Sequence, residues 1–277
     1  MKKEELNSNQ KLTYAVLISA CTPTACTELT YSESDGDPCI QDVVMGALGD
    51  CYFMAALASV AWAARARLGN YGNGYKFGTD TTATKLPDKK IATLNGQPCY
   101  ARVGPRNVIW PLLYERAYAI WRKCGNPCTS MSCISGGAGI KGLEDITGWG
   151  KKLVDLSTFD PVSTDPAKKI PHINGIASVP AVAWTSTGDP NNKIYGEHTY
   201  SYLGHYPAAN PAYVVLRNPY GGLVAEPSTN VTREDRVWYS NPRSLCQINF
   251  KTTNDGIFAL SLSTFKSKFN GLGYVKQ

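Results

Sequence analysis

The sequence predicts an α+β protein whose front half is helical and whose back half is rich in strands. Two front segments, residues 51–68 and 107–124, have the composition and apolar spacing of helices. After about residue 155, runs rich in Val, Tyr, Thr and Trp alternate with turn residues, as is typical of strands. No internal repeat is visible. This order indicates an α+β chain in two lobes.

Length and composition indicate a globular protein and argue against a membrane span or nucleic-acid binding. The chain has 277 residues, of which 43% are hydrophobic and 18% charged, enough for a sizeable core. No run of roughly 18 apolar residues occurs, so we expect no membrane span. The net charge of +6 is spread thinly, without a basic patch interleaved with aromatics. Nucleic acid is therefore not an expected partner.

The chain divides into three expected regions. Residues 1–35 are polar and turn-rich and are expected to be an N-terminal tail or linker. Residues 36–150 form the helical lobe and residues 151–277 the β-rich lobe. The boundary lies where the helical turn in "GLEDITGWG" (142–150) is broken by glycine.

Two helices are expected in the first lobe. The run that starts at Cys51 is almost entirely apolar, which predicts a helix buried on most sides and ending near the glycine cluster at 68–74. In the second helix one face is apolar and carries Trp110, Leu113, Ala117 and Trp121. Glu115 and Arg116 are expected to point toward solvent.

Short strands are expected in both lobes. Their ranges are 91–94, 100–103, 179–186, 198–206, 212–218 and 256–262. After the last of them, Ser263 is expected to cap a short helix that carries Phe265 and Phe269.

Nine cysteines leave the redox state open. They lie at positions 21, 26, 39, 51, 99, 124, 128, 133 and 246. Eight paired cysteines and one free thiol would suit an oxidising compartment, whereas buried reduced cysteines would suit the cytosol. Cys124, Cys128 and Cys133 could hold a metal, but their spacing fits no zinc pattern well.

The N-terminus does not settle the compartment. The stretch from Ile18 to Cys21 looks like a bacterial lipoprotein box, although the acidic residues before it and the short apolar run argue against a signal. A soluble protein is expected, either cytoplasmic or secreted.

The stretch "MGALGDCYFMAALASVAW" (45–62) places a thiol where a glycine-rich turn becomes a helix. Unpaired backbone N–H groups and the positive end of the helix dipole lie at such a position. Both favour a thiolate, so a lowered pKa is expected for Cys51. Gly46 and Gly49 would allow a tight turn and the close approach of another chain. This arrangement suits a nucleophile.

A nucleophilic cysteine requires a base, and the chain has three histidines. His198 opens a predicted strand, and Asn218 ends the next one. Two neighbouring antiparallel strands could bring these side chains together, so that the amide orients the imidazole. His172 and His205 are expected on the surface.

Several segments, in order, resemble the calpain family of cysteine proteases. They are "GALGDCYFMAALASV" (46–60), "WPLLYERAYA" (110–119), "SGGAGIKGLEDITG" (135–148), the pair "HTYSYLG" (198–204) and "VVLRNPYG" (214–221), and "NDGIFALSLSTFKSKF" (254–269). The resemblance covers about residues 36–275, the whole protease core of that family.

The resemblance implies a papain-like fold with the active site in a cleft between two lobes. It assigns Cys51 as nucleophile, His198 as general acid and base, and Asn218 as the residue that orients His198. The implied activity is that of a cysteine endopeptidase, which hydrolyses peptide bonds of protein or peptide substrates through a thioester. A thiol-dependent acyl transferase is a further alternative that nothing in the sequence favours.

Two positions near the expected oxyanion hole and cleft differ from the family. Met45 stands six residues before Cys51, where the family has a glutamine that donates to the oxyanion. A thioether cannot donate a hydrogen bond. The chain is therefore a slow enzyme, an enzyme with another donor, or an inactive binding or regulatory protein of this fold. Tyr220 replaces a tryptophan that shields the His–Asn pair, whereas Gly49 follows the family pattern.

Calpain cores usually bind calcium in each lobe. Asp42 fits one ligand position and Asp255 another. Lys141 and Ile257, however, stand where carboxylates are expected, and hard cations need several oxygen ligands. We therefore expect no required cofactor and no metal, with Asp42 and Asp255 as weak calcium candidates.

Overall fold

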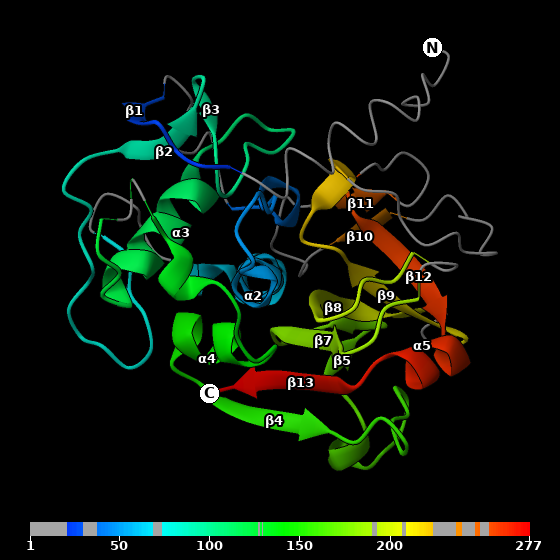
Figure 1. Cartoon of the computed structure of the whole chain (residues 1–277). Helices are drawn as coiled ribbons and strands as arrows, with labels where there is room; N and C mark the ends of the chain where they lie inside the picture. The colour runs from blue at the N-terminus through cyan, green and yellow to red at the C-terminus, as the bar shows by residue number, and fades with distance from the viewer. Residues whose placement is uncertain are drawn as a thin grey trace.

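The computed structural model describes residues 21–29, 38–68, 74–126, 128, 130–189, 193–206, 209–223, 237–239, 247–249 and 255–277. The helices are α2 (Cys51–Ala63), α3 (Trp110–Trp121), α4 (Lys141–Thr147) and α5 (Leu262–Lys268). Short 3-10 turns are η1 (Ile40–Asp42), η2 (Arg65–Leu68), η4 (Ser132–Ile134), η5 (Pro166–Lys168) and η7 (Gly221–Leu223). Helices α2, α3 and α4 gather on one side of the molecule, and α5 lies at the far end of the sheet (Figure 1).

The largest sheet has eight antiparallel strands. Along its main path the order is β12 (Ile257–Ser261), β9 (Tyr213–Arg217), β8 (His198–Tyr206), β7 (Ala181–Thr185), β13 (Gly271–Lys276) and β4 (Gly150–Val154). Strand β6 (Ile176–Ala177) also pairs with β8, and β5 (His172–Ile173) pairs with β6. The mixed composition confirms the α+β class.

The remaining described strands form two smaller sheets. One joins β1 (Ala25–Glu28), β2 (Lys90–Leu94) and β3 (Gln97–Pro98), and the other joins β10 (Val237–Tyr239) and β11 (Gln247–Asn249). The segment 100–103, expected to be a strand, contributes only an isolated bridge between Arg102 and Val44.

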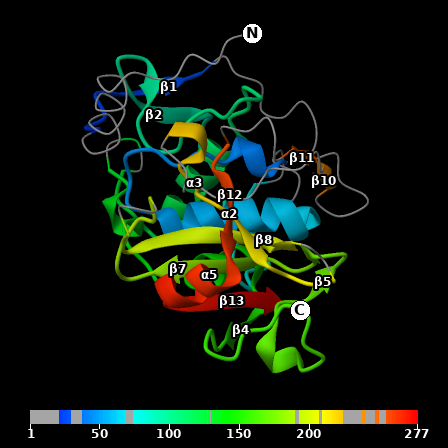
Figure 2. The same cartoon turned by 90° about the vertical axis from the view of Figure 1, so that its right-hand side faces the viewer.

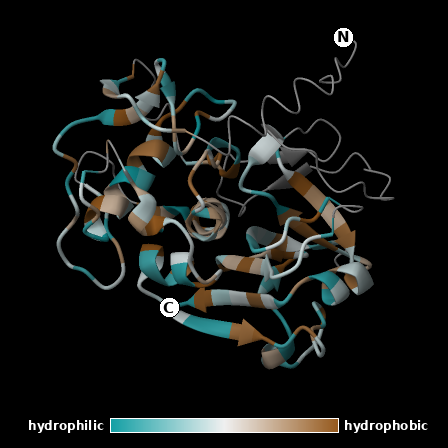
Figure 3. Ribbon diagram, viewed as in Figure 1, coloured by the Kyte–Doolittle hydropathy of each residue, from teal (hydrophilic) through white to brown (hydrophobic). Residues whose placement is uncertain are grey.

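Both faces of the eight-stranded sheet are buried. Successive side chains along a strand point to opposite faces, so each strand contributes to two cores. Val182, Leu203 and Val215 belong to the core on the α2 side, whereas Tyr200 and Leu216 belong to a second core. Strand β4, at the edge, begins with exposed hydrophilic residues, which disfavour pairing with another chain (Figure 3).

Helix α2 runs alongside β7 and β8 (Figure 2). The Ser59 hydroxyl donates to the Ala181 carbonyl of β7 at 2.8 Å and accepts from the Ala181 N–H at 2.7 Å. Ser201 of β8 donates to the Ala55 carbonyl at 2.7 Å. These bonds fix the helix that begins at Cys51 against the strand that begins at His198. The expected buried helix is confirmed, although α2 ends at Ala63, before the glycine cluster.

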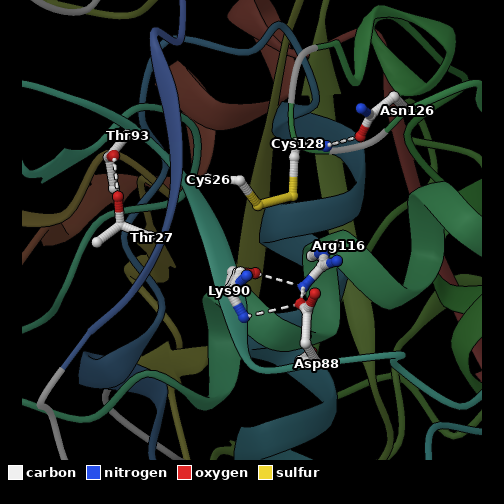
Figure 4. The surroundings of a disulfide bond; sticks show 8 residues. All are labelled: Cys26, Thr27, Asp88, Lys90, Thr93, Arg116, Asn126 and Cys128. Atoms are coloured by element: carbon white, nitrogen blue, oxygen red, sulfur yellow. Dashed lines mark hydrogen bonds and ion pairs between the residues drawn. A yellow bond between two sulfur atoms is a disulfide. The ribbon is translucent and has the colours of Figure 1, made fainter.

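Helix α3 is buried on a second face, which was not expected. Glu115 and Arg116 were expected in solvent, but they are only 1% and 4% exposed. Arg116 is buried because its guanidinium pairs with Asp88 and donates to the Lys90 carbonyl (Figure 4). Glu115 accepts the Ala101 N–H. Polar partners from other segments therefore make a second face of α3 part of the interior.

Neither of the other two histidines is exposed as expected: His205 is buried and His172 is half-buried. His205 is 3% exposed, and its ring lies 4.4 Å from the ring of His172. His172 Nε2 lies 3.0 Å from the Tyr202 hydroxyl. The expectation of surface positions was wrong because β5 and β8 bring both rings against the same part of the sheet.

The N-terminal cap of α5 also differs from the expectation: Ser261, not Ser263, accepts the Thr264 N–H at 3.1 Å.

Disulfides bind the front of the chain together. The described pairs are Cys21–Cys99, Cys26–Cys128 and Cys124–Cys133, and Cys39 is disulfide-bonded as well. Figure 4 shows the Cys26–Cys128 bond beside α3. Among the cysteines that the structure describes, Cys51 alone is free. Position 246 lies outside the described residues.

These bonds count against two alternatives that the sequence had left open but not favoured. Cys124, Cys128 and Cys133 are bonded to other sulfurs and do not form a metal site. Cys21 was the residue to be lipidated in a lipoprotein signal, but its sulfur is bonded to Cys99. The rest of that signal lies outside the described residues.

Across the described ranges, none of the helices is both long and apolar enough to cross a bilayer. The lobe boundary at residue 150 stays a prediction; β4 begins there and pairs with β13.

Candidate active site

Cys51 is the first residue of α2. The helix starts there because the Asp50 carbonyl accepts the N–H groups of Phe53 at 2.8 Å and Met54 at 3.1 Å. The earlier N–H groups of the first turn have no intrahelical acceptor. The thiol is half-buried, and its Sγ lies 3.9 Å from the Glu197 carbonyl oxygen, which it faces as a donor. Cys51 therefore lies against the residue that precedes His198.

The glycines before Cys51 leave room for other parts of the same chain to approach the backbone closely. A Cβ on Gly46 would lie 1.5 Å from the Tyr100 carbonyl oxygen, so only glycine fits there. A Cβ on Gly49 would lie 2.8 Å from Ser135 Oγ, and the Gly49 carbonyl accepts the Gly136 N–H at 2.7 Å. The close approach expected at this turn is made by the protein's own loops.

His198 and Asn218 are brought together by adjacent strands. His198 begins β8, and Asn218 directly follows β9, which pairs with β8 in antiparallel fashion. His198 Nε2 lies 3.0 Å from Asn218 Oδ1, and the two residues are 5% and 1% exposed.

The protonation of His198 follows from a second bond to the same amide. The Tyr220 N–H donates to Asn218 Oδ1 at 3.1 Å, which identifies this atom as the acceptor oxygen. His198 must then donate from Nε2, and in the neutral ring Nδ1 is left with a lone pair. The amide therefore selects the tautomer in which Nδ1 can accept a proton.

Three tyrosine rings surround the imidazole. Tyr220 stacks on His198 with ring centroids 5.3 Å apart and planes 7° apart. Tyr200 meets the ring edge-on at 4.9 Å, and Tyr195 lies 5.6 Å away. Sequence reasoning named Tyr220 but missed the other two. Alternation along a strand offered a signal for Tyr200, since residues two apart share a face.

Burial holds the candidate dyad in its neutral form. Desolvation raises the pKa of the Cys51 thiol above its ordinary value of 9.0, opposed by hydrogen bonding to Thr199. Burial also lowers the pKa of His198 to about 4, although the hydrogen bond to Asn218 acts to raise it. The lowered thiol pKa expected from the helix terminus is thus wrong for this arrangement, because desolvation outweighs the hydrogen bonds from Thr199 and Tyr52 that favour the thiolate.

Met45 provides no side-chain donor at the site. It is 2% exposed and packs in the core on the α2 side. Its backbone N–H donates to the Pro219 carbonyl at 2.8 Å, directly after Asn218. The chain therefore passes beside the candidate site at this position with an apolar side chain turned inward.

The two calcium candidates are engaged by other groups. Asp42 Oδ2 accepts from Trp110 Nε1 at 2.8 Å and from Arg106 at 3.2 Å, so a guanidinium already neutralises it. Asp255 accepts the Ile257 N–H at 3.1 Å, and Lys141 pairs with Asp145. Within the described ranges, no three His, Cys, Asp or Glu side chains are grouped to hold a metal. Asp42 and Asp255 thus have protein donors in this structure, and independence from calcium stays a prediction.

A free thiol at a helix start and a tautomer-selecting His–Asn pair are the parts of a cysteine hydrolase. A family model of calpain family cysteine proteases matches residues 76–276, which include His198 and Asn218 and begin after Cys51. The chain belongs to the calpain family of cysteine proteases. The catalytic domain of this family is papain-like.

Curated relatives agree with this assignment. A thiol protease of Porphyromonas gingivalis is 27% identical over 268 residues, covering 84% of this chain and 54% of that protein. Calpain clp-1 of Caenorhabditis elegans is 26% identical, covering 82% and 31%. Human calpain-8 is 25% identical, covering 83% and 35%. The chain thus spans about a third to a half of the length of these relatives.

Proposed function

We propose that this chain is a cysteine endopeptidase in which Cys51 is the nucleophile, His198 the general acid and base, and Asn218 the residue that orients His198. The observation that carries the proposal is the His198–Asn218 hydrogen bond, whose acceptor is identified by the Tyr220 N–H. The substrates are proteins or peptides, bound in a cleft between the two lobes.

The first step is attack on the peptide carbonyl. The thiol turns from the Glu197 carbonyl toward His198 Nδ1, which takes its proton. As sulfur bonds to the carbonyl carbon, the carbonyl π electrons move to oxygen. The imidazolium keeps its Nε2–H bond to Asn218 throughout.

The oxyanion that forms lies near the start of α2. The Cys51 N–H, which has no intrahelical acceptor, is available as one donor. Met45 cannot supply the second, and one missing donor typically costs about 10²–10³ in rate. A low turnover number is therefore expected.

The second half of the reaction returns the proton. His198 Nδ1–H protonates the leaving amine as the C–N bond breaks, which leaves a thioester on Cys51. Water then attacks the thioester while Nδ1 accepts one of its protons. The C–S bond breaks, the acid leaves, and Nδ1 returns the proton to sulfur.

The decisive experiment combines labelling and turnover. A thiol-reactive epoxysuccinyl peptide should label Cys51 rapidly, and the reaction should be lost in His198→Ala. Cys51→Ala should abolish hydrolysis of a denatured protein substrate. Unchanged hydrolysis in Cys51→Ala would refute the proposal, and equal labelling with and without calcium would establish independence from the metal.

Met45 supports a second candidate, a binding or regulatory protein that has lost turnover. This candidate predicts peptide binding without hydrolysis, and partial activity in Met45→Gln. Because Met45 is buried, the new amide also costs roughly 1–3 kcal/mol of stability unless it turns into the site. Robust turnover by the unmodified chain would exclude this candidate.

The disulfides favour an oxidising compartment over the cytosol. Disulfides persist outside the reducing cytosol, and the described cysteines are all bonded except Cys51, the proposed nucleophile.

A further inference from the structure

A chain of hydrogen bonds joins the residue after Cys51 to helix α4. The Tyr52 hydroxyl of α2 lies 3.3 Å from the Tyr118 hydroxyl of α3. Tyr118 in turn donates to Asp145 Oδ2 of α4 at 2.6 Å. The three residues are no more than 3% exposed, and their helices gather on one side of the molecule (Figure 1). The catalytic steps proposed above use none of these side chains.

The partners of Asp145 fix the direction of this chain. The carboxylate pairs with Lys141 and with Arg122, whose Nη1 lies 3.3 Å from Oδ2, so it accepts and does not donate. The single proton of Tyr118 therefore goes to Asp145, and the Tyr118 oxygen accepts from Tyr52. Arg122 Nη1 also donates to the Tyr118 oxygen, at 3.1 Å, and fills its second lone pair. The bonds thus run from Tyr52 through Tyr118 to an anchored carboxylate.

The loop at residues 135–138 lies beside the candidate nucleophile. Its Gly136 N–H donates to the Gly49 carbonyl at 2.7 Å, two residues before Cys51. All four loop residues are exposed, although the loop is bonded to the turn that leads into α2. A peptide extends over several residues on either side of the bond that is cut. A peptide carbonyl that reaches Cys51 therefore brings the rest of the peptide past this loop.

The same loop packs on the Tyr52 ring. A Cβ on Gly137 would lie 2.7 Å from Cε1 and from Cζ of Tyr52, so the absence of a side chain lets the loop backbone approach the ring. These two atoms form the edge of the ring next to the hydroxyl. The hydrogen bond to Tyr118 consequently holds the part of the ring on which the loop rests.

We propose that Tyr52 and Tyr118 are positioning residues for substrate binding, anchored by Asp145, and that their hydrogen bonds hold the loop at 135–138 where it meets a peptide bound at Cys51. The inference rests on the proposed function in taking Cys51 as the nucleophile of a peptidase. Loss of a bond in the chain should weaken the capture of a peptide reagent. The reactivity of the thiol itself should stay the same, because the chain acts on the loop.

The test uses variants that lose one hydroxyl and keep the ring. Tyr118→Phe interrupts the chain in its middle, and Tyr52→Phe removes its first bond. The matched control is Tyr114→Phe, one turn earlier on α3, whose hydroxyl donates to the Lys76 carbonyl at 3.4 Å, outside the chain. Each variant is treated with the epoxysuccinyl peptide and, separately, with iodoacetamide, which carries no peptide. Urea denaturation reports whether each variant is folded.

Peptide labelling of Cys51 should slow about fivefold in Tyr118→Phe and in Tyr52→Phe, the factor that corresponds to one hydrogen bond of about 1 kcal/mol. Alkylation by iodoacetamide should not change, and Tyr114→Phe should match the unmodified chain with both reagents. Because the bonds act in series, the double variant Tyr52→Phe/Tyr118→Phe should be no slower than Tyr118→Phe. Equal slowing in the Tyr114 variant, equal slowing with iodoacetamide, or multiplied effects in the double variant would overturn the proposal.

A second measurement needs no variant. The Gly136 amide of the unmodified chain should exchange slowly with solvent although the residue is exposed, because the held loop keeps this N–H on the Gly49 carbonyl. Exchange as fast as that of an unbonded surface amide would show that the loop is not held, and the proposal would fail.

These readouts separate the two proposals. If peptide labelling follows the chain of hydrogen bonds but peptide hydrolysis is never detected, the positioning residues stand and the peptidase proposal fails. If hydrolysis is detected and labelling is the same in all the variants, the peptidase stands and the positioning role fails. No labelling of Cys51 by the peptide reagent would contradict both.

Discussion

At the residue scale, the ring of Tyr220 covers one face of the His198 imidazole. Its ring stacks on His198, and burial lowers the pKa of that histidine to about 4. Because the proposed base is the neutral ring, the acid limb of activity should lie near this value rather than near the ordinary histidine pKa of 6.5.

Replacement of Tyr220 by alanine should admit water to one face of His198. The pKa of the imidazole then rises toward its ordinary value, and the acid limb of kcat/KM moves to higher pH by about one unit or more. Tyr220→Phe keeps the ring and is the matched control. A limb that does not move in the alanine variant would show that Tyr220 does not shield the ring.

Sequence alone predicted which residues meet at the site better than their chemical state. The positions of His198 and Asn218 at the ends of successive strands predicted their contact. The tautomer required the Tyr220 N–H, and the charge state required the burial of both side chains in the folded chain. No local pattern encodes desolvation, so the expected lowering of the Cys51 pKa was wrong.

At the scale of the elements, Ser59 fixes α2 on the sheet. Its hydroxyl both donates to and accepts from the backbone of Ala181. Ser59→Ala leaves a buried N–H and a buried carbonyl without this partner, so the free energy of unfolding should fall by about 2 kcal/mol. Ser267→Ala, at an exposed position of α5, should change it by less than about 0.5 kcal/mol. Urea denaturation measures both, and equal effects would contradict this role of Ser59.

The disulfides differ in the length of chain that they close. Cys26–Cys128 spans 102 residues, whereas Cys124–Cys133 spans 9. Loop entropy in the unfolded state predicts a loss of about 5 kcal/mol for Cys26→Ser/Cys128→Ser and about 3 kcal/mol for Cys124→Ser/Cys133→Ser. The same denaturation experiment ranks them. A larger loss for the short loop would show that native contacts, not chain entropy, dominate.

Elements were predictable where one periodicity dominated. The apolar run of α2 and the alternating strands β7, β8, β9 and β12 were expected near their observed positions. The solvent-facing side of α3 was predicted wrongly because Glu115 and Arg116 are buried by partners from distant segments, including Asp88. Such pairings depend on the tertiary fold, which hydrophobic spacing does not contain.

At the scale of the whole molecule, histidines with lowered pKa values should make stability depend on pH. Burial lowers the pKa of His172 to about 3 in the folded state, against an ordinary value of 6.5 for a histidine side chain in water. The unfolded chain therefore binds a proton first as the pH falls, and stability is lost from about pH 6.5 downward.

His172→Gln can keep the bond to Tyr202 without titrating. Between about pH 6.5 and about pH 4.5 the unmodified chain should lose about 2 to 3 kcal/mol relative to this variant. The difference between their unfolding free energies, measured at each pH, isolates this group from other acids and bases. A difference independent of pH would mean that His172 titrates in the folded chain as it does in the unfolded chain, and would contradict the prediction.

A last consequence concerns mechanics. The Met45 N–H is bonded to the Pro219 carbonyl, and Arg217 Nη2 donates to the Val43 carbonyl at 2.5 Å. The stretches of chain that lead into the nucleophile and out of the orienting amide are therefore joined across the molecule. Opening the protein between these two stretches would break both bonds, so a hinge that keeps them bends elsewhere and moves Cys51 and Asn218 together.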